Sequence, residues 1–439
     1  MEDGKMETKD TAKVAEKVTE KAIEAMKGQF ICDSCIGRNF AELLSGLTNK
    51  ERGRIIRHYI AFLVDSGERI DVDTSNFYGI KFRNVKIRPD KPKKCAVCKN
   101  FFLDELEDTA RKILDRVKGA EFDTFLIGTV VSDGLLHAEE TAWHRIGVEW
   151  CEPIKSEINR ELGKLVEKLA QKKYKEKNPD VMAVVDLNTG RVNLQISSLY
   201  ISGGYKKLVR GIPQTKWLCV KCGGKGCEAC EGLGKLYKTS VQEQIEKPLI
   251  KAAKAKKSKF HGAGREDVDA RCLAYRPFVI ELLRPLKRKV DLEKMRGLIN
   301  KSRKVQVSRL KFAGKDDVTR IKSYSSDKTY LAVVAFENDI DKRKLGLVRK
   351  LAGQTISQKT PSRVAHRRAD KYRKRKIKAV GARQTGRREL ELRIRAEAGT
   401  YIKEMIDGDG GRTELNIAGI LGNKVKSIKL DVIKIHTEL

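Results

Sequence analysis

Eight of the ten cysteines stand in four CxxC pairs, and this spacing restricts how the surrounding chain can fold. The pairs are Cys32/Cys35, Cys95/Cys98, Cys219/Cys222 and Cys227/Cys230. Two such turns can supply four thiolates in the tetrahedral arrangement that Zn²⁺ prefers. In an intracellular chain this spacing favours metal binding over disulfides. The sequence therefore predicts one or two structural zinc ions.

The positions of the pairs predict two separate clusters. The first two pairs lie far apart in turn-like contexts, and a shared metal would clip the segment between them onto the first helix. The last two pairs form abutting CxxCxGxG repeats, "CVKCGGKG" and "CEACEGLG", which resemble half of the zinc-binding region of DnaJ-type chaperones. Independent buried or redox pairs, or an exposed and vacant second cluster, are the alternatives. Neither cluster offers a His or an acid as an open ligand, so we expect no zinc catalysis.

The charge balance indicates a polyanionic partner. The 92 Lys and Arg residues outnumber the 59 Asp and Glu residues, which gives a formal charge of +33. Such a surplus on a folded chain most often serves to bind nucleic acid. A generally basic proteome or a need for solubility is the alternative explanation. No uncharged apolar run approaches the roughly 18 residues of a membrane span, and the N-terminus lacks an apolar signal core. We therefore expect a cytoplasmic protein that does not enter a membrane.

The 439 residues exceed one ordinary core, and the pattern predicts an α+β protein of several domains. We divide it into a helical and zinc-knuckle region (1–74), an α/β module with the second knuckle (75–210), a Cys/Gly-rich connector (211–240) and a mixed, mainly antiparallel sheet with helices (241–439). Expected helices cover 1–27, 41–65, 103–119, 137–178 with a break near Pro153, 291–302 and 341–353. Expected strands lie within 70–102, 122–133, 179–209 with "NTG" and "SGG" turns, 278–283, 305–314, 319–326, 329–338, 389–399 and 425–439.

The stretch "GAGREDVDAR" (262–271) concentrates acids in a basic chain. Its glycines allow a sharp turn. Arg265 stands two residues before Asp267, so an extended stretch would put both side chains on one face, where Arg265 could hold Asp267 ionised. Asp269 shares that face. Composition alone leaves a solvated acidic turn and a catalytic carboxylate both open.

Several motifs resemble those of one enzyme family. "GRED" looks like the catalytic loop of pseudouridine synthases, and "HGAGREDVDARCL…RPFVIEL" is similar to the archaeal and eukaryotic Pus-ten branch. "IPQTKWLCVKC" resembles that family's connector, and "AGTYIKEMIDGDGGRTELNIAGILG" (398–422) resembles its C-terminal motif. The CxxC knuckles and the 75–210 module resemble its N-terminal zinc and THUMP regions. One departure is "LAYRPF", which is shorter and lacks the glycine-containing turn that we expect in the family at this point, so the edge of the loop would be shaped differently here.

The resemblance implies a tRNA pseudouridine synthase, an isomerase that converts T-loop uridines at positions 54 and 55, with 55 the safer expectation, and that needs no organic cofactor. It makes Asp267 the essential catalytic residue, with Asp269 as its competitor, and leaves open whether the Asp attacks or deprotonates the sugar. Tyr330 would stack on the flipped uracil, because a base that reacts must leave its stack. Tyr401 would be the second substrate-side tyrosine. The alternative for each is an ordinary half-buried tyrosine on a strand.

Basic residues are the expected RNA contacts. Lys403 follows Tyr401 by two residues, and on a strand it could approach Asp267. Arg412 is a candidate phosphate or T-loop contact, and either base could equally be a solvated charge. Residues 341–390 hold 18 Lys and Arg against 3 acids, which would neutralise phosphates. With Tyr372 as a stacking residue, this stretch would form a flexible flap over bound tRNA. The family resemblance implies that the THUMP module holds the acceptor end while the T-loop enters the active site. A solvated loop is the alternative.

Two rival functions remain. The first is a non-catalytic tRNA-binding or maturation protein on the same fold. The second is another THUMP-bearing modifier, such as a methyltransferase or thiouridine synthase, which needs a glycine-rich cofactor loop or a phosphate loop. "SGGYKK" is the nearest candidate and lacks the spacing. No obligate protein partner is implied.

Overall fold

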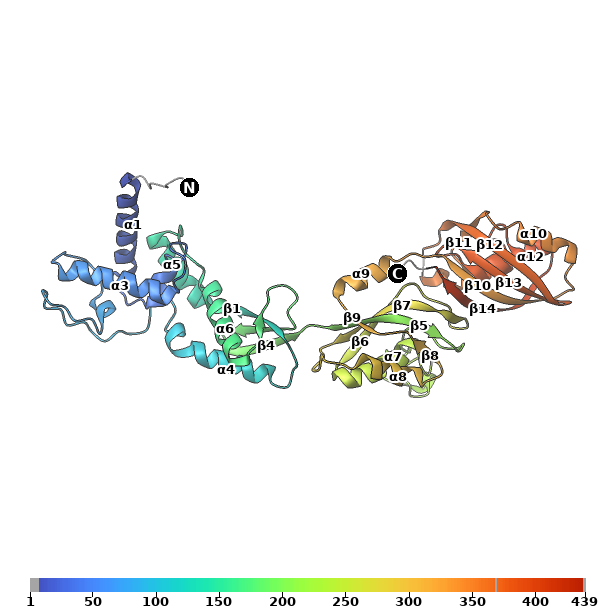
Figure 1. The fold of residues 1–439 in the computed structure, drawn as a ribbon, viewed down its shortest axis with the longest axis horizontal. Coiled ribbons are helices and arrows are strands. Elements are labelled where there is room, and N and C mark those ends of the chain that lie inside the picture. The colour runs from blue at the N-terminus through green and yellow to red at the C-terminus, as the bar shows by residue number, and fades with distance from the viewer. Residues whose placement is uncertain (1–7, 368, 437–439) are drawn as a thin grey trace. The chain divides into compact units, whose positions relative to one another are not determined.

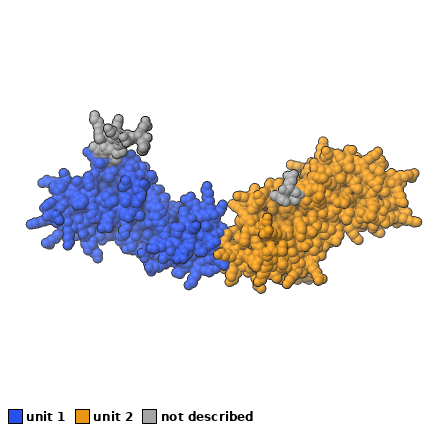
Figure 2. All heavy atoms as spheres, viewed as in Figure 1, with its two compact units in different colours: residues 1–197 blue, residues 198–439 orange. Residues whose placement is uncertain are grey.

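The computed structural model describes residues 8–367 and 369–436 (Figure 1). The chain forms two compact units, residues 1–197 and 198–439, which Figure 2 colours separately. None of the helices in the described part of the chain combines the length and the apolar character needed to cross a bilayer. The predicted helix over 1–27 is confirmed as α1 (Thr8–Met26), and residues 1–7 lie outside the described part.

The helix expected over 41–65 is α3 (Asn49–Asp65), and it begins later than predicted because Thr48 caps it. The Thr48 hydroxyl accepts from the Glu51 amide, and the Glu51 carboxylate accepts from the Thr48 amide at 2.8 Å. This reciprocal capping box satisfies two backbone donors that no helical carbonyl reaches. The strands expected within 70–102 are wrong: among the described residues this range contains the 3₁₀ turn Thr74–Phe77 and the start of the π-helical turn Phe101–Glu105.

Helix α2 (Asp33–Arg38) crosses α3 at a pair of glycines. A Cβ atom on Gly37 would lie 1.8 Å from the carbonyl oxygen of Asn49, and one on Gly53 would lie 1.8 Å from that of Asp33. The two backbones therefore touch, and any side chain at either position would separate them. Arg57 of α3 reinforces the crossing through an ion pair of 2.6 Å with Asp33.

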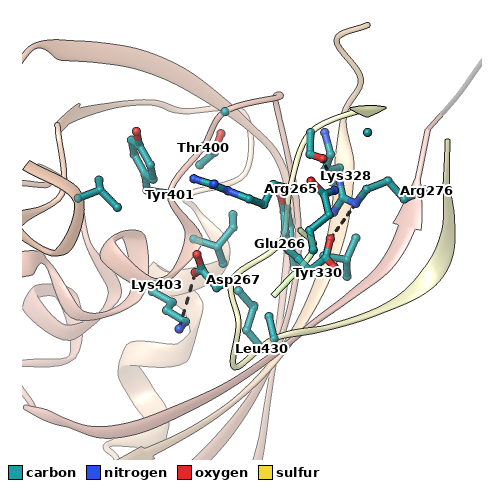
Figure 3. A pocket seen from close by; sticks show the side chains of 18 of the residues that line it. Arg265, Glu266, Asp267, Arg276, Lys328, Tyr330, Thr400, Tyr401, Lys403 and Leu430 are labelled. Carbon is teal, nitrogen blue, oxygen red and sulfur yellow. Dashed lines mark hydrogen bonds and ion pairs between the residues drawn. The ribbon is translucent and has the colours of Figure 1, made fainter. Parts of the chain in front are cut away.

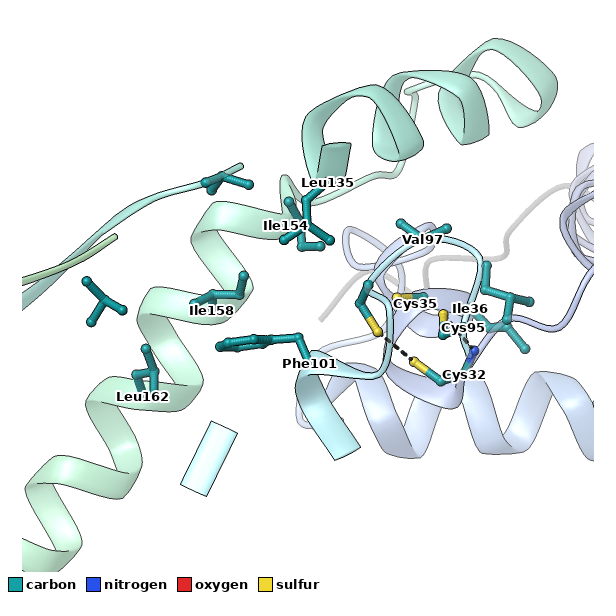
Figure 4. Close-up of a cluster of buried hydrophobic side chains, with 14 of the residues drawn as sticks. Cys32, Cys35, Ile36, Cys95, Val97, Phe101, Leu135, Ile154, Ile158 and Leu162 are labelled. Atoms are coloured by element: carbon teal, nitrogen blue, oxygen red, sulfur yellow. Dashed lines mark hydrogen bonds between the residues drawn. The ribbon is translucent and has the colours of Figure 1, made fainter. Parts of the chain in front are cut away.

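The first four cysteines meet beside this crossing (Figure 4). Cys32 and Cys35 belong to the start of α2, whereas Cys95 and Cys98 precede the π-helical turn. All four are buried, and their sulfur atoms lie within 4.8 Å of one another. The predicted pairing of the first two CxxC turns is therefore confirmed as a geometry that can hold a metal ion.

The rest of the first unit is a four-stranded sheet with helices. Its strand order is β2-β1-β3-β4, with β1 parallel to β2 and β3, and with β3 antiparallel to β4. The strands are β1 (Thr124–Val130), β2 (Lys173–Tyr174), β3 (Val181–Asp186) and β4 (Arg191–Ile196). The helices are α4 (Leu106–Val117), α5 (Asp133–Ile146) and α6 (Ile154–Ala170). The predicted break at Pro153 is confirmed, since this residue is the N-cap of α6.

The second unit is built on one ten-stranded sheet. Its order is β11-β12-β13-β10-β14-β7-β5-β8, with β6 beside β7 and β9 beside β5. The strands are β5 (Leu199–Lys207), β6 (Lys257–Gly262), β7 (Arg271–Leu283), β8 (Val305–Val307), β9 (Lys311–Ala313), β10 (Lys328–Phe336), β11 (Thr355–Lys359), β12 (Tyr372–Gly386), β13 (Glu389–Ala396) and β14 (Val425–Ile435). All are antiparallel except the short pairing of β14 with β7.

Two apolar cores lie on either side of that parallel pairing. Helices α7 (Val241–Ala253) and α8 (Leu292–Asn300) pack on β5 to β8, and α10 (Leu345–Arg349), α11 (Ile402–Asp407) and α12 (Ile417–Leu421) pack on β10 to β14. The parallel rungs join Asp431 to Arg271 and Val432 to Cys272. Asp431 also forms 2.6 Å ion pairs with Arg210 and Arg271, so charge pairing secures the junction.

Two glycines expected in a turn lie within a strand instead. "SGG" is part of β5, which pairs with β7, β8 and β9, so the "SGGYKK" stretch is not a loop. A Cβ on Gly203 would lie 2.9 Å from Leu310, and one on Gly204 would lie 2.9 Å from Tyr275, so neighbouring side chains occupy this space. β5 belongs to the second unit, which begins at Ser198.

Three further segments bear on the predictions. Residues 319–326 are largely the helix α9 (Lys315–Ser323), with Asp317 accepting from the Gly314 amide at its N-terminus. "LAYRPF" continues β7, so this segment has no turn where one was expected in the family's loop. The densest part of the basic stretch contains a long strand: β12 pairs with β11 and β13, so residues 372–386 are not a flexible flap. Arg368 and residues 437–439 of the predicted last strand lie outside the described part.

We predict that Cys35→Ser removes one equivalent of bound metal per chain. Loss of a metal site should lower the free energy of unfolding by about 4 kcal/mol or more, the range of mutations that delete a metal ligand. Metal analysis and urea unfolding check both effects. Cys151→Ser is the matched control, because Cys151 belongs to neither cluster. An unchanged metal content in Cys35→Ser would contradict the site.

Candidate active site

The acidic loop projects from the end of a β-hairpin. β6 ends at Gly262 and β7 begins at Arg271, and the two strands pair antiparallel with Gly262 opposite Phe278. Gly264 adopts a positive φ of 77°, which an L side chain rarely tolerates. A Cβ on Gly262 would lie 2.7 Å from the amide nitrogen of Gln214. The glycines therefore let the loop turn against the connector.

A cavity of about 550 Å³ opens beside this loop (Figure 3). Five of the six predicted catalytic and substrate-binding residues line it: Arg265, Asp267, Tyr330, Tyr401 and Lys403. They come from the β6–β7 loop, from β10 and from the start of α11. The fold thus brings together three motifs that the sequence separates.

Two cations flank the Asp267 carboxylate. Arg363 donates from Nη1 to Oδ1 at 2.8 Å, and the Lys403 Nζ lies 3.7 Å from Oδ2. Lys403 binds Asp269 more closely, at 2.6 Å and 2.7 Å. Although burial opposes ionisation, the Lys403 ammonium lowers the pKa of Asp269 below its ordinary value. The predicted approach of Lys403 to Asp267 is confirmed, but from a helix rather than from a strand.

Arg363 is the site residue that the sequence analysis missed. It lies in the 3₁₀ turn Ser362–Arg367, and its Nε binds the buried Glu404 carboxylate of α11 at 2.5 Å. The adjacent Ser362 amide donates to Asp409 at 2.9 Å. These contacts fix the loop after β11 on α11 and aim Arg363 at Asp267. In the sequence Arg363 is one of many basic residues in the 341–390 stretch, and nothing local distinguishes it from a phosphate contact.

A buried polar network holds the acidic loop between β6 and β7 in place. The Glu266 carboxylate lies 2.9 Å from the Arg276 Nε and accepts from the Tyr205 hydroxyl at 2.9 Å. The Lys207 ammonium donates to the backbone carbonyls of Asp267 and Val268 at 2.8 Å and 3.1 Å. Glu266 is therefore a structural acid, while its neighbour Asp267 faces the cavity.

The two predicted tyrosines have different environments. Tyr330 is buried in β10, where burial raises the pKa of its phenol to about 12, although Arg276 opposes this shift. Its hydroxyl is therefore neutral at physiological pH. Tyr401 is the N-cap residue of α11, and the buried Gln358 side chain accepts from its amide and donates to its carbonyl. Backbone anchoring thus places the Tyr401 ring at the cavity.

Arg412 does not line the cavity. Its guanidinium donates to the Thr360 carbonyl at 2.8 Å and 3.0 Å and pairs with Asp370 at 2.5 Å. It therefore secures the loop that carries Arg363, and a direct contact with RNA stays a prediction.

Comparison with known proteins assigns the family. Residues 200–436 match the family model "Pus10, C-terminal", and residues 109–186 match "Pus10 THUMP domain, archaeal". The chain belongs to the Pus10 family. Relatives named "tRNA pseudouridine synthase Pus10" from Methanothrix thermoacetophila and Methanopyrus kandleri are each 39% identical to it. The alignments cover 96% and 94% of this chain and 95% and 98% of the relatives.

Pus10 membership confirms the resemblance inferred from the motifs, and the second match confirms a THUMP domain within the first unit. The crystal structure of a Cbf5-Nop10-Gar1 complex is a more distant likeness, at 16% identity and a TM-score of 0.30. That alignment covers 53% of this chain and 48% of the other.

The second cysteine cluster of this Pus10 chain lies in the connector before α7. Tetrahedral coordination with Zn–S bonds of about 2.3 Å places neighbouring sulfurs about 3.8 Å apart. The measured separations are 3.9 Å for Cys219–Cys227, 3.9 Å for Cys222–Cys230 and 3.7 Å for Cys227–Cys230. Backbone amides of Gly226 and Gly234 also point at Cys222 and Cys230. The cluster therefore fits a metal ion.

A pH-dependent contribution to stability follows from Lys328 in the Pus10 cavity wall. Burial and the nearby Arg276 lower its pKa from 10.5 to about 8. Between these values the unfolded chain binds more protons than the native one, so the free energy of unfolding rises with pH. We predict that any stability advantage of Lys328→Met over the wild type shrinks as pH rises from 7.5 to 9.5 in urea unfolding. The exposed Lys426→Met is the control, and parallel pH profiles for wild type and Lys328→Met would contradict this account.

Proposed function

We propose that this chain is a tRNA pseudouridine synthase that isomerises T-loop uridine, at position 55 and also at 54. The observation that carries the proposal is the gathering of Asp267, Tyr330, Tyr401 and Lys403 around one cavity in a Pus10-family chain. The family relatives are named for this activity.

In the proposed reaction the C1′–N1 bond of uridine breaks, the uracil rotates, and a C1′–C5 bond forms. The C5 proton is lost and N1 gains a proton, so atoms balance without an organic cofactor. Asp267 acts on the ribose, by attack or by deprotonation. Arg363 and Lys403 hold its two carboxylate oxygens in place, since they approach Oδ1 and Oδ2 separately.

Tyr330 and Tyr401 receive the flipped base. An enzyme that reacts with a base pays for its unstacking, and an aromatic face recovers part of that cost. The neutral Tyr330 phenol brings no charge against the uracil ring, because its pKa lies well above physiological pH.

The strand β12 is the proposed surface for the T-arm. Lys374 and Lys376 are exposed on alternate residues of the strand, which places them on one face. Tyr372 is also exposed and lies 5.6 Å from the Lys359 ammonium, so it presents an aromatic ring among cations. The THUMP domain is the proposed second contact, at the acceptor end.

We assign structural zinc to both cysteine clusters, because each brings four sulfur atoms together and the second matches tetrahedral spacing. Zinc would stabilise the knuckles and supply no chemistry to the uridine. We retain the four-region division and a cytoplasmic location, where tRNA is modified, as parts of this proposal.

Asp267→Asn should bind tRNA and form at least about a thousandfold less pseudouridine, because loss of a reacting group is not compensated by binding. Mass mapping of an unmodified tRNA transcript after incubation with the pure protein measures product. Asp269→Asn is the matched variant and should still form pseudouridine with a kcat close to that of the wild type, because Asp269 takes no part in the bond changes. Loss of activity in Asp269→Asn alone would move the catalytic role, and full turnover by Asp267→Asn would favour a non-catalytic tRNA-binding protein.

Replacing Lys371, Lys374 and Lys376 by Gln should weaken tRNA binding and reduce the salt dependence of its affinity. Each lost phosphate contact lowers the slope of log K against log salt by about 0.7–0.9. Affinity measurements at several salt concentrations give this slope. Gln at Lys247, Lys251 and Lys254, which are exposed on or just after α7, provides a charge-matched control. Equal slopes for both triple variants would remove β12 from the interface.

A further inference from the structure

A second hollow lies on the connector side of the acidic loop. It has a volume of about 210 Å³ and shares Asp267, Arg363 and Lys403 with the larger cavity. Its own wall includes Pro213, Trp217 and Asp269. Asp267 therefore borders two adjoining spaces, and the proposed uridine site with its two tyrosines accounts for only one of them.

Trp217 is held in this wall by the cysteine knuckle. The Leu236 amide donates to the Trp217 carbonyl at 3.0 Å, and the Cys219 amide donates to the Gly234 carbonyl at 2.9 Å. The indole also packs edge-on against Tyr237, with ring centroids 5.6 Å apart. The ring position thus depends on a short two-stranded ladder whose other end carries the four sulfur ligands.

The lining of the hollow fits a nucleobase better than a phosphate. The carboxylates of the hollow, Asp267 and Asp269 with the buried Glu266, balance its three cations, so no surplus of positive charge favours an anion. Asp267 and Asp269 also offer acceptors to base N–H groups. Arg363 and Lys403 provide donors, and the indole provides a stacking face. A base edge carries both donors and acceptors, so this mixture of groups suits it.

We propose that this hollow binds the base next to the target uridine, stacked on Trp217. The inference rests on the proposed function: extraction of the uridine removes a stacking partner from its neighbour, and an aromatic side chain replaces it. Trp217 is thereby a substrate-binding residue that the knuckle positions. Recognition of the neighbouring base also supplies a contact by which the enzyme selects the sequence around its target.

Fluorescence tests the stacking without turnover. Trp143→Phe and Trp150→Phe leave Trp217 as the single tryptophan, and Asp267→Asn stops the reaction. An unmodified T-arm hairpin should quench this fluorescence on binding. The same hairpin with an abasic nucleotide on one side of the target should bind without full quenching. Unchanged fluorescence with saturating hairpin would overturn the proposal.

Kinetics on the otherwise unaltered enzyme supply the second readout. Trp217→Ala should lower kcat/KM for the hairpin about tenfold or more, the size of a lost base–aromatic stack, and Trp217→Phe should restore most of it. The abasic substitution should cost the wild type similarly and add little in Trp217→Ala. The metal content of each variant verifies that the knuckle is intact. If Trp217→Ala loses its metal, the activity of Trp217→Phe and the fluorescence measurement test the proposal in its place.

The outcomes separate the two proposals. If the wild type forms pseudouridine and a metal-loaded Trp217→Ala keeps the full kcat/KM, the Trp217 site is overturned. The proposed function is then still supported. No pseudouridine from wild type sinks the proposed function, and quenching by the hairpin then shows whether Trp217 binds RNA.

Discussion

The buried pair of Glu266 and Arg276 fixes the geometry on which the candidate site depends. Both side chains are almost completely excluded from solvent, and their charges lie 2.9 Å apart. Removing one partner of such a pair typically costs about 3–5 kcal/mol, because the other charge is left buried and unpaired. Tyr205 of β5 donates to the Glu266 carboxylate, and Lys207 of the same strand donates to the loop backbone, which completes the network. The next residue, Asp267, can therefore face the cavity without being needed to hold the loop.

Residues from the other half of the sheet hold the Asp267 carboxylate in place. Arg363 and Lys403 belong to segments after β10, while Asp267 belongs to the β6–β7 loop. Only the short parallel pairing of β14 with β7 joins these halves within the sheet, and Asp431 reinforces it with two arginines. Although burial opposes it, these arginines lower the pKa of Asp431, so the pair stays charged at neutral pH. The junction of the two cores therefore controls the distance between the acid and its cations.

Local patterns predicted the residues that carry a motif and missed those defined by distant contacts. Asp267, Tyr330, Tyr401 and Lys403 stand in recognisable strings, and the structure places all four at one cavity. In the sequence Arg363 looks like the other basic residues around it. Only the folded chain brings Glu404 and Asp267 beside it.

The errors in secondary structure have the same origin. The glycines of "SGG" read as a turn, but Leu310 and Tyr275 from other strands occupy the space beside them. Residues 319–326 contain β-branched and aromatic residues, yet the acids and bases at opposite ends of α9 suit a helix. β12 is highly basic, but its partners β11 and β13 make it a strand.

The two cysteine clusters also differ in when their four ligands become available as the chain is synthesised. The second cluster spans 12 residues, with four residues between its two CxxC pairs, so its ligands leave the ribosome almost together. The first waits for Cys98, long after Cys32 and Cys35 have emerged, and closing that longer loop costs more chain entropy. The contact of Gly37 with α3 needs no metal and can form earlier. Nascent α2 and α3 can therefore hold the first cysteine pair in place until the second arrives.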